Sequence, residues 1–439
     1  MFGYAGRVLH VDLSQGRSHE VKLDRDLASR FIGGTGINAK LAYDLIERGV
    51  DPLSPANKLI IGVGPLVGTV FPGACRTDVT AKSPLTNLIG VTGSGGSFSA
   101  FLKYCGYDHL VVHGKSHKPV YLLVEDGKAR IESADGFWGL DNLQVVKALR
   151  REQGDDIHVL SIGPAGEKLV RITSIMIDGQ HALARTGLGA VMGSKNIKAI
   201  LVREEGSLKT ADPRRLMKLA SEAFERLLDL MTNSQLKAYR DVGTIFRLEQ
   251  QEKDFQNASK NFREVTVGIS EVVGAEAFKM LKEGDVSCFA CPVGCKKWMK
   301  VREGRHTGLE MVGLDIGSPK YFGGCLGILD INEVAKGTDI VNRLGMDMFS
   351  ASCTIAFAIE LFERDIIDSK DTGGLKLEWG NADAIFDLLE QISKREGIGD
   401  ILAEGTARAA KKIGKNAESL CNTIKGLELT NWEPRAYFN

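Results

Sequence analysis

The pattern of hydrophobic and polar positions divides the chain into two parts of different character. In residues 1 to about 205, short apolar or alternating runs separated by glycine turns predict strands. The first two, Arg7–Leu13 and Ser18–Leu23, are expected to form a hairpin around Gly16, and one helix is expected at Asn38–Arg48. The further predicted strands are Lys58–Val63, Thr77–Ala81, Leu110–His113, Val120–Val124, Ala129–Glu132, His158–Ile162, Ile172–Ile177 and Lys198–Val202.

Helical spacing of apolar residues takes over after Thr210. Asp212 suits an N-cap and Pro213 the first helical position, so a helix is expected to begin there. The predicted helices are Leu216–Met231, Ser234–Gln250, Val273–Lys282, Ile331–Leu344, Phe349–Glu363, Ala382–Lys394 and Ile398–Ile413. We therefore expect an α+β protein with a β-rich N-terminal domain at 1–207 and a mostly α-helical domain at 208–426. The pattern predicts that residues 427–439 are extended, and we expect them to be the stub of a third domain that this chain lacks.

Composition narrows the class of protein. Of 439 residues, 43% are hydrophobic and 26% charged, as in an ordinary globular protein. Lys plus Arg equals Asp plus Glu at 56 each, so net charge does not favour nucleic acid or an anionic membrane as a partner. There is no secretory signal pattern and no run near the roughly 18 apolar residues of a membrane span. Eight cysteines, three of them clustered, suit a reducing, cytoplasmic compartment and a metal site.

The clustered cysteines are the strongest chemical motif. Cys288, Cys291 and Cys295 have the spacing C-x2-C-x3-C, which favours a [4Fe–4S] cluster whose fourth ligand is remote. A zinc knuckle is the alternative, with His306 as the nearest further ligand, and cysteines without a metal are a third reading. The spacing is the reverse of the radical SAM order. The isolated cysteines are expected to pack in the core, with the last two as remote candidates for the fourth ligand: Cys75, Cys105, Cys325, Cys353 and Cys421.

Two glycine loops invite a nucleotide-binding interpretation, but each departs from the pattern. Gly93-x-Gly95-x-x-Phe98 lacks the third glycine of the dinucleotide fingerprint, and Gly193-Ser194-Lys195 reverses the Walker order. Tight turns explain them equally well. The backbone amides of such loops can still hold a phosphate.

Several polar residues are candidates only in combination, because each has an ordinary structural explanation. Arg76, His181 and Arg185 are by default solvated, and Gly345 is by default a helix C-cap. Glu310 lies between Leu309 and Met311, and such an apolar setting would raise a carboxyl pKa and suit proton transfer. A structural glutamate is the alternative.

Taken together, these segments resemble the aldehyde:ferredoxin oxidoreductase family, whose members carry a tungsten bis-pyranopterin beside a [4Fe–4S] cluster. The resemblance runs from residue 3 to the end of the chain. Its most specific segments are Ile61–Leu85, Ser94-Gly95-Gly96, Gly163-Pro164-Ala165-Gly166-Glu167, Gly187–Lys198 and Cys288–Cys295.

The resemblance implies a role for each candidate residue. The β-rich domain would form a base for the pterin pair, with tungsten or molybdenum and with magnesium as an accompanying ion. Arg76 would bridge the pterin and the cluster, and Ser94, Gly95, His181 and Arg185 would line the phosphate side of the pterin. Cys288, Cys291 and Cys295 would hold the cluster, and Glu310 would assist proton movement. The pterin motif D-x-x-G-x-D corresponds here to Asn342, Gly345 and Asp347, with an amide in place of the first acid.

Three departures from the family pattern stand out. The Glu-x-x-His pair that binds a metal between family subunits is replaced by Lys336 and Asp339, so a homodimer is expected to lack that bridging metal. The segment Gly317–Gly327 is longer and carries an extra cysteine. The third domain, which in the family supplies the fourth cluster cysteine, is expected to be absent.

The implied activity is the oxidation of an aldehyde to a carboxylic acid, with electrons passing through the cluster to ferredoxin. Two alternatives remain. One is a reductase of the same family acting on a 2-oxoacid or an aromatic thioester, because fold does not determine substrate. The other is an electron-transfer subunit that binds a cluster and has no pterin chemistry.

Overall fold

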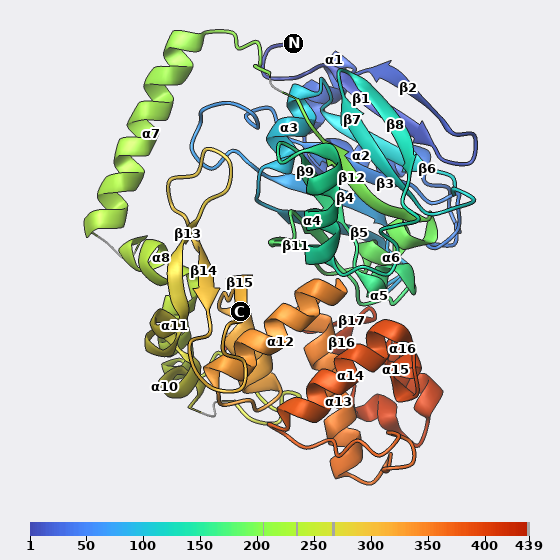
Figure 1. Cartoon of the computed structure of the whole chain (residues 1–439), viewed down its shortest axis with the longest axis vertical. Coiled ribbons are helices and arrows are strands. Elements are labelled where there is room, and N and C mark those ends of the chain that lie inside the picture. Colours follow the sequence, from blue (N-terminus) through green and yellow to red (C-terminus); the bar gives the residue numbers. More distant parts are fainter. Residues whose placement is uncertain (205, 234–235, 266–267, 437–439) are drawn as a thin grey trace. The chain divides into compact units, whose positions relative to one another are not determined.

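The computed structural model describes residues 1–204, 206–233, 236–265 and 268–436, and contacts divide the chain into two units (Figure 1). The first unit is Met1–Leu228 together with two short segments from later in the sequence, Ser287–Pro292 and Arg343–Gly345. The remaining residues form the second unit. Both inserted segments come from motifs singled out above, the cysteine loop and the segment around Gly345.

The strands described in the first unit form two six-stranded sheets. In the first sheet the spatial order is β2 (Arg17–Lys22), β1 (Arg7–Asp12), β6 (His109–His113), β3 (Leu59–Val63), β4 (Thr77–Lys82) and β5 (Ile89–Ser94). In the second it is β11 (His181–Leu183), β10 (Ile175–Ile177), β9 (His158–Ser161), β12 (Ile197–Val202), β7 (Val120–Glu125) and β8 (Lys128–Ser133). Neighbours are antiparallel except β1 with β6 and β12 with β7.

Side-chain alternation along the strands builds the layers of this unit. Leu9 and Val11 of β1 share one apolar core with Leu122 and Val124 of β7, so the inner faces of the two sheets meet. The outer face of the first sheet packs against α1 (Arg25–Phe31) and α2 (Thr35–Leu45). The outer face of the second sheet is covered by α4 (Asn142–Gln153). The other helices of the unit are α3 (Phe98–Tyr104), α5 (Pro164–Glu167), α6 (Leu188–Ser194) and most of α7 (Pro213–Asn233).

The second unit is mainly helical and surrounds α13 (Met348–Glu363), whose residues 350–361 are all buried. Its other helices are α8 (Leu236–Val242), η1 (Gly243–Arg247), α9 (Leu248–Lys253), α10 (Ile269–Val273), α11 (Ala275–Leu281), η2 (Pro319–Cys325), α12 (Ile331–Leu344), α14 (Ala382–Lys394), α15 (Ile398–Leu402), α16 (Thr406–Ile413), η3 (Ala417–Leu420) and η4 (Pro434–Ala436). Two small antiparallel sheets complete it: β13 (Lys282–Val286), β14 (Lys296–Lys300) and β15 (Glu310–Gly313), and the pair β16 (Thr423–Ile424) and β17 (Leu427–Glu428). No helix in the described residues is long and apolar enough to cross a membrane.

The α+β class is confirmed, but the first part of the chain contains more helix than its pattern indicates. Five of its described helices, α1 and α3–α6, were not predicted. Among them, α4 has a capping box in which Asp141 accepts from the Gln144 N–H, a motif readable from sequence. In the second part, the helices expected at Ser234–Gln250 and Ile398–Ile413 are interrupted, the first at Gly243 and the second before Thr406. Residues 234–235 lie outside the described residues.

The two units change after Leu228, and the domain boundary predicted near residue 207 stays a prediction. Leu216 and Leu219 of α7 line an apolar pocket together with Phe2 and Leu66 of the first unit. The segment expected to be a separate stub packs, as far as residue 436, within the second unit. There, Asn431 N–H donates to the Tyr321 hydroxyl at 2.7 Å. Residues 437–439 lie outside the described residues.

Candidate metal and cofactor site

The three clustered cysteines lie in the loop that joins β13 to β14, two antiparallel strands. Positive φ angles at Ala290 (+51°) and Gly294 (+55°) turn the backbone inside this loop. Cys291 N–H donates to the Cys288 carbonyl at 3.1 Å, which closes its first turn. Cys288 and Cys291 belong to the first unit and Cys295 to the second.

The first half of the cysteine loop is bound to the backbone of two glycine-containing segments of the first unit. Gly73 N–H donates to the Ala290 carbonyl at 3.1 Å, and Phe289 N–H donates to the Gly96 carbonyl at 3.2 Å. Gly95 has no side chain, and Cys288 occupies the space that one would fill: a Cβ atom at Gly95 would lie 2.6 Å from Cys288 Sγ. Gly95 therefore has a steric role at the thiol loop.

A fourth cysteine, Cys75, meets this loop. It is only 7% exposed, and its side chain forms a hydrogen bond with Cys288. That hydrogen bond and burial raise the pKa of Cys75 above its usual range, and Cys291 contributes in the same direction. The packing role expected for Cys75 is thus incomplete, because this side chain contacts a candidate metal ligand.

The end of the loop is held within the second unit. A Cβ atom at Gly243 would lie 2.5 Å from the Cys295 carbonyl oxygen, so the glycine that interrupts the expected helix allows the backbone to approach. Lys297 is buried, and its Nζ donates to the Gly294 carbonyl at 2.6 Å and to Asp285 Oδ1 at 2.8 Å. This lysine bonds the backbone next to Cys295.

The three thiols of the loop are donors of the kind that iron–sulfur clusters take. In the described residues, no three His, Cys, Asp or Glu side chains gather closely enough to bind one metal ion. Tetrahedral zinc with Zn–S bonds of about 2.3 Å requires thiolates about 3.8 Å apart. Ligands of a cluster each bind a different iron and stand farther apart, and sulfur donors suit such clusters.

Arg76 and Ser94 are brought together at the ends of β4 and β5, where Thr77 pairs with Ser94. The Arg76 side chain is 67% exposed; its Nη2 donates to the Gly93 carbonyl at 2.9 Å, and its Nε lies 3.5 Å from Asp78 Oδ1. Arg76 follows Cys75 directly, but Cys75 is buried toward the cysteine loop. Two adjacent residues therefore supply an exposed cation, Arg76, and a buried thiol, Cys75.

His181 also joins this group. It is buried on β11, and a Cβ atom at Gly96 would lie 3.5 Å from His181 Cδ2. Arg185 lies farther along, in a turn where Arg185, Thr186 and Gly187 all have positive φ. Ser83 Oγ donates to the Thr186 carbonyl at 2.7 Å and anchors this turn beside β5. The first unit thus gathers Arg76, Ser94, Gly95 and His181, with the Arg185 turn beside the same strand.

The segment around Gly345 is divided between the units, with Asn342 and Asp347 in the second and Gly345 in the first. Gly345 has φ +75°, and a Cβ atom there would lie 2.7 Å from Gly163 N. Asp347 caps α13 by accepting from Phe349 N–H at 3.1 Å. These contacts give Gly345 and Asp347 structural roles, whatever they bind in addition.

Glu310 is not in the apolar setting that its sequence neighbours suggested. It lies on β15 opposite Lys300, and the two side chains pair at 2.8 Å with each more than two-fifths exposed. The physical reason is the period of a strand, which directs Leu309 and Met311 to the face opposite Glu310.

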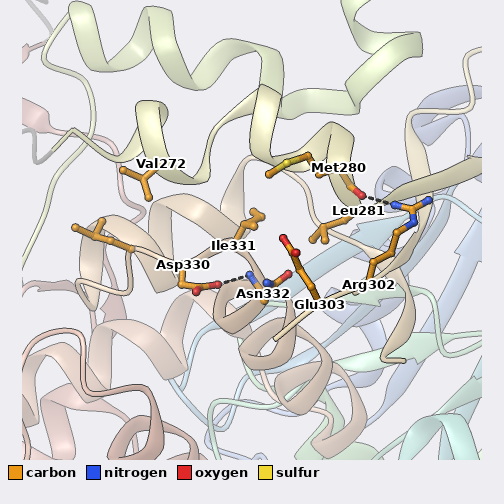
Figure 2. Close-up of a pocket in the computed structure, with 9 residues that line it drawn as sticks. Val272, Met280, Leu281, Arg302, Glu303, Asp330, Ile331 and Asn332 are labelled. Carbon is orange, nitrogen blue, oxygen red and sulfur yellow. Dashed lines mark hydrogen bonds between the residues drawn. The ribbon is translucent and has the colours of Figure 1, made fainter. Parts of the chain in front are cut away.

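Other candidate features have structural explanations. Buried Lys195, from the loop that resembles a Walker motif, donates to the carbonyls of Asn57 at 2.6 Å and Pro55 at 3.2 Å, and burial lowers its pKa to about 7. A cavity of about 440 Å³ lies in the second unit. Figure 2 shows residues that line it. Its polar groups bond mainly within the protein: Arg302 donates to the Met280 carbonyl, and Asp330 accepts from Asn332 N–H.

Sequence reasoning missed Cys75 and Lys297 as parts of the thiol site. The position of Cys75 directly before Arg76 was the one available indication. Lys297 lies two residues after Cys295, but nothing in the sequence distinguishes it from the exposed lysines nearby.

Comparison with known proteins gives matches along nearly the whole chain. Residues 8–204 match the family model described as aldehyde ferredoxin oxidoreductase, N-terminal domain, and residues 221–439 match that for domains 2 and 3. The tungsten-containing aldehyde ferredoxin oxidoreductase of Pyrococcus furiosus is 38% identical over 445 residues, covering 99% of this chain and 71% of that protein. An aliphatic sulfonate oxidoreductase, WOR-like subunit, from the same organism is 32% identical and covers 98% and 70%.

A solved structure with the same fold is the active-site complex BamBC of benzoyl coenzyme A reductase with 1,5-dienoyl-CoA. It matches with a TM-score of 0.88 and 31% identity, covering 98% of this chain and 66% of that chain. The present chain therefore spans about two thirds of the length of that structure.

Proposed function

This chain belongs to the aldehyde ferredoxin oxidoreductase family, and on that premise we propose that it oxidises an aldehyde to a carboxylic acid and passes the electrons to ferredoxin or a similar carrier. The observation that carries the proposal is the contact of the Cys288 side chain with Gly95, in the same unit as the exposed Arg76. This arrangement places thiol donors and a cation on one unit, as a cluster beside an anionic cofactor requires.

The proposed cofactors are a tungsten or molybdenum bis-pyranopterin, with magnesium, and a [4Fe–4S] cluster. When bound, the pterin metal centre supplies the two-electron chemistry. Arg76 presents its guanidinium to anionic cofactor groups, and Ser94 and His181 add polar atoms on the same side. Arg185, Asn342, Gly345 and Asp347 complete the proposed pterin-binding set.

Cys288, Cys291 and Cys295 are the proposed cluster ligands. Cys353 and Cys421 stay remote candidates for the fourth position. Cys353 is buried and donates to the Leu429 carbonyl at 3.5 Å, and burial raises the pKa of Cys421 to about 11.

The test is metal analysis of the full chain purified without oxygen, followed by an aldehyde assay with a ferredoxin or viologen acceptor. Tungsten or molybdenum with about four irons per chain, together with aldehyde-dependent reduction of the acceptor, is the expected result. Zinc as the sole metal would overturn the cluster assignment. Iron without tungsten or molybdenum would favour the electron-transfer subunit over the enzyme.

A second candidate activity is the reduction of an aromatic thioester, favoured by the 31% identity and TM-score of 0.88 to the benzoyl coenzyme A reductase structure. The same preparation distinguishes the two activities. Benzoyl-CoA with a low-potential electron donor tests the reductase, and a panel of aldehydes tests the oxidase.

We also propose that any homodimer lacks the bridging metal of the family. Lys336 Nζ and Asp339 Oδ2 lie 3.6 Å apart on α12, and this ion pair replaces two potential ligands. In size-exclusion chromatography, the elution volume of the chain is expected to stay the same when a metal chelator is added.

A further inference from the structure

Cys75 has no role in the proposed function, yet it contacts one of the proposed cluster ligands. A Cβ atom placed on Gly95 would lie 2.6 Å from Cys288 Sγ and 3.8 Å from Cys75 Sγ, so both sulfurs occupy one small space. The Cys288 side chain raises the pKa of Cys75 and the Gly96 backbone lowers it, so both lie within interaction range of its sulfur. Cys75 Sγ also lies 3.5 Å from the Gly73 carbonyl oxygen, which competes with Cys288 for the single S–H. Cys75 is 7% exposed.

Hydrogen-bond contact between the two side chains indicates how Cys75 takes part. Ligands of a cubane cluster bind different irons and are held farther apart than sulfurs in direct contact. A thiol in contact with a ligand thiolate is placed instead to donate its S–H to that sulfur.

We propose that Cys75 is a positioning residue of the cluster, which donates an S–H hydrogen bond to the Cys288 thiolate and raises the reduction potential of the cluster. The inference rests on the cluster assignment in the proposed function. Hydrogen bonds to cluster sulfurs are one of the means by which a protein sets this potential. Reduction adds negative charge to the cluster and its thiolates, so a donor at Cys288 stabilises the reduced form more than the oxidised form.

The experiment compares the wild-type chain with Cys75→Ala and Cys75→Ser, each carrying its cluster. Iron and sulfide content are measured first, and the midpoint potential then follows from a redox titration monitored by electron paramagnetic resonance. Cys75→Ala is expected to keep its iron and shift to a more negative potential. Cys75→Ser keeps an O–H donor and is expected to remain closer to the wild-type potential.

Cys105→Ala is the matched control. Cys105 is equally buried in the first unit, but its Sγ donates to the Val124 carbonyl at 3.2 Å, in a contact unrelated to the cysteine loop. Its removal is expected to leave the cluster potential unchanged.

Three outcomes would overturn the inference. An unchanged potential in Cys75→Ala would show that Cys75 only packs beside the cluster, while the cluster assignment would stand. Loss of one iron per cluster, with a three-iron spectrum, would make Cys75 a ligand instead of a donor. A wild-type chain without iron would overturn this inference together with the cluster assignment, so failure of one is distinguishable from failure of both.

Discussion

The backbones of Gly163 and Gly345 lie in direct contact, and neither residue has room for a side chain. A Cβ atom on Gly345 would lie 2.7 Å from Gly163 N, and one on Gly163 would lie 2.4 Å from the Leu344 carbonyl oxygen. Ser174 N–H donates to the Gly345 carbonyl at 2.9 Å, and Arg343 Nη1 pairs with Asp141 at 3.0 Å. This contact joins the segment 343–345 to the rest of the first unit.

Gly345→Ala is therefore expected to lower the free energy of unfolding by about 3 kcal/mol or more, because a positive φ and a steric overlap act together. Thermal and urea unfolding measure the effect. The matched control is Gly49→Ala, where φ is +81° but nothing lies within 4 Å of the added Cβ atom, and about 1 kcal/mol is expected. Equal losses in the two variants would show that the close approach to Gly163 contributes nothing.

Each of Cys288→Ser, Cys291→Ser and Cys295→Ser is expected to lose most of its iron, because a hydroxyl is a poorer ligand for iron–sulfur clusters than a thiolate. Iron content per chain and the visible charge-transfer absorption are the measurements. Cys421→Ser is the control and is expected to retain its iron. Full iron occupancy in any of the three loop variants would remove that cysteine from the ligand set.

Oxidation of the iron-free chain with diamide is expected to join Cys75 to Cys288, because these two side chains are already in contact. Each thiol loses one hydrogen, diamide accepts both and becomes its hydrazine, and one disulfide forms. Peptide mapping by mass spectrometry identifies the pair. A Cys75→Ser chain should not form this link, and a wild-type chain that links Cys288 only to other cysteines would contradict the contact.

Glu310→Gln tests the proton-transfer role that the family resemblance implies for Glu310, which predicts that turnover of the cofactor-loaded enzyme falls at least about tenfold. Stability should change little, because the Lys300–Glu310 pair is exposed and screened by solvent. Lys300→Gln breaks the same ion pair but keeps the carboxylate, so its turnover should match the wild-type value. Equal turnover in all three proteins would leave Glu310 with only its structural pairing.

Acidification is expected to destabilise the first sheet through His10. This ring stacks on His19 of β2 with 5.0 Å between centroids, and burial, then His19, His113 and Lys58, lower its pKa to about 4. The unfolded chain takes up a proton near pH 6.5, but the folded ring resists it until about pH 4, so stability is lost as pH falls through this window.

His10→Phe keeps the stacking and removes this titration. The free energy of unfolding that is lost between pH 7 and pH 5, followed through Tm, should therefore be smaller by about 1 kcal/mol in this variant. This is less than the full pKa shift of His10 would give, because the ring is only partly buried. His117→Phe, at an exposed turn, should leave that difference unchanged. A wild-type pH dependence retained in His10→Phe would assign the acid sensitivity to other groups.

The local pattern of the sequence predicted those elements that depend on local interactions. The hairpin of β1 and β2 and the helices α12 and α14 appear where alternation and helical spacing placed them. The C-x2-C-x3-C spacing of the thiol loop is likewise a property of the sequence itself. Five helices of the first unit were missed: four of them, α1, α3, α5 and α6, have seven residues or fewer and are too short to show helical periodicity. The capping box at Asp141 of α4 was a readable signal.

What only the tertiary structure decided is which distant segments meet. The residues Ser287–Pro292 and Arg343–Gly345 pack with the first unit, Cys75 meets Cys288, and Gly243 makes room for the Cys295 carbonyl. Strand alternation also placed Glu310 opposite Lys300 rather than among its apolar sequence neighbours. Periodicity records which face of an element is apolar, whereas these contacts depend on the shapes of two surfaces far apart in the chain, and only the folded backbone brings those surfaces together.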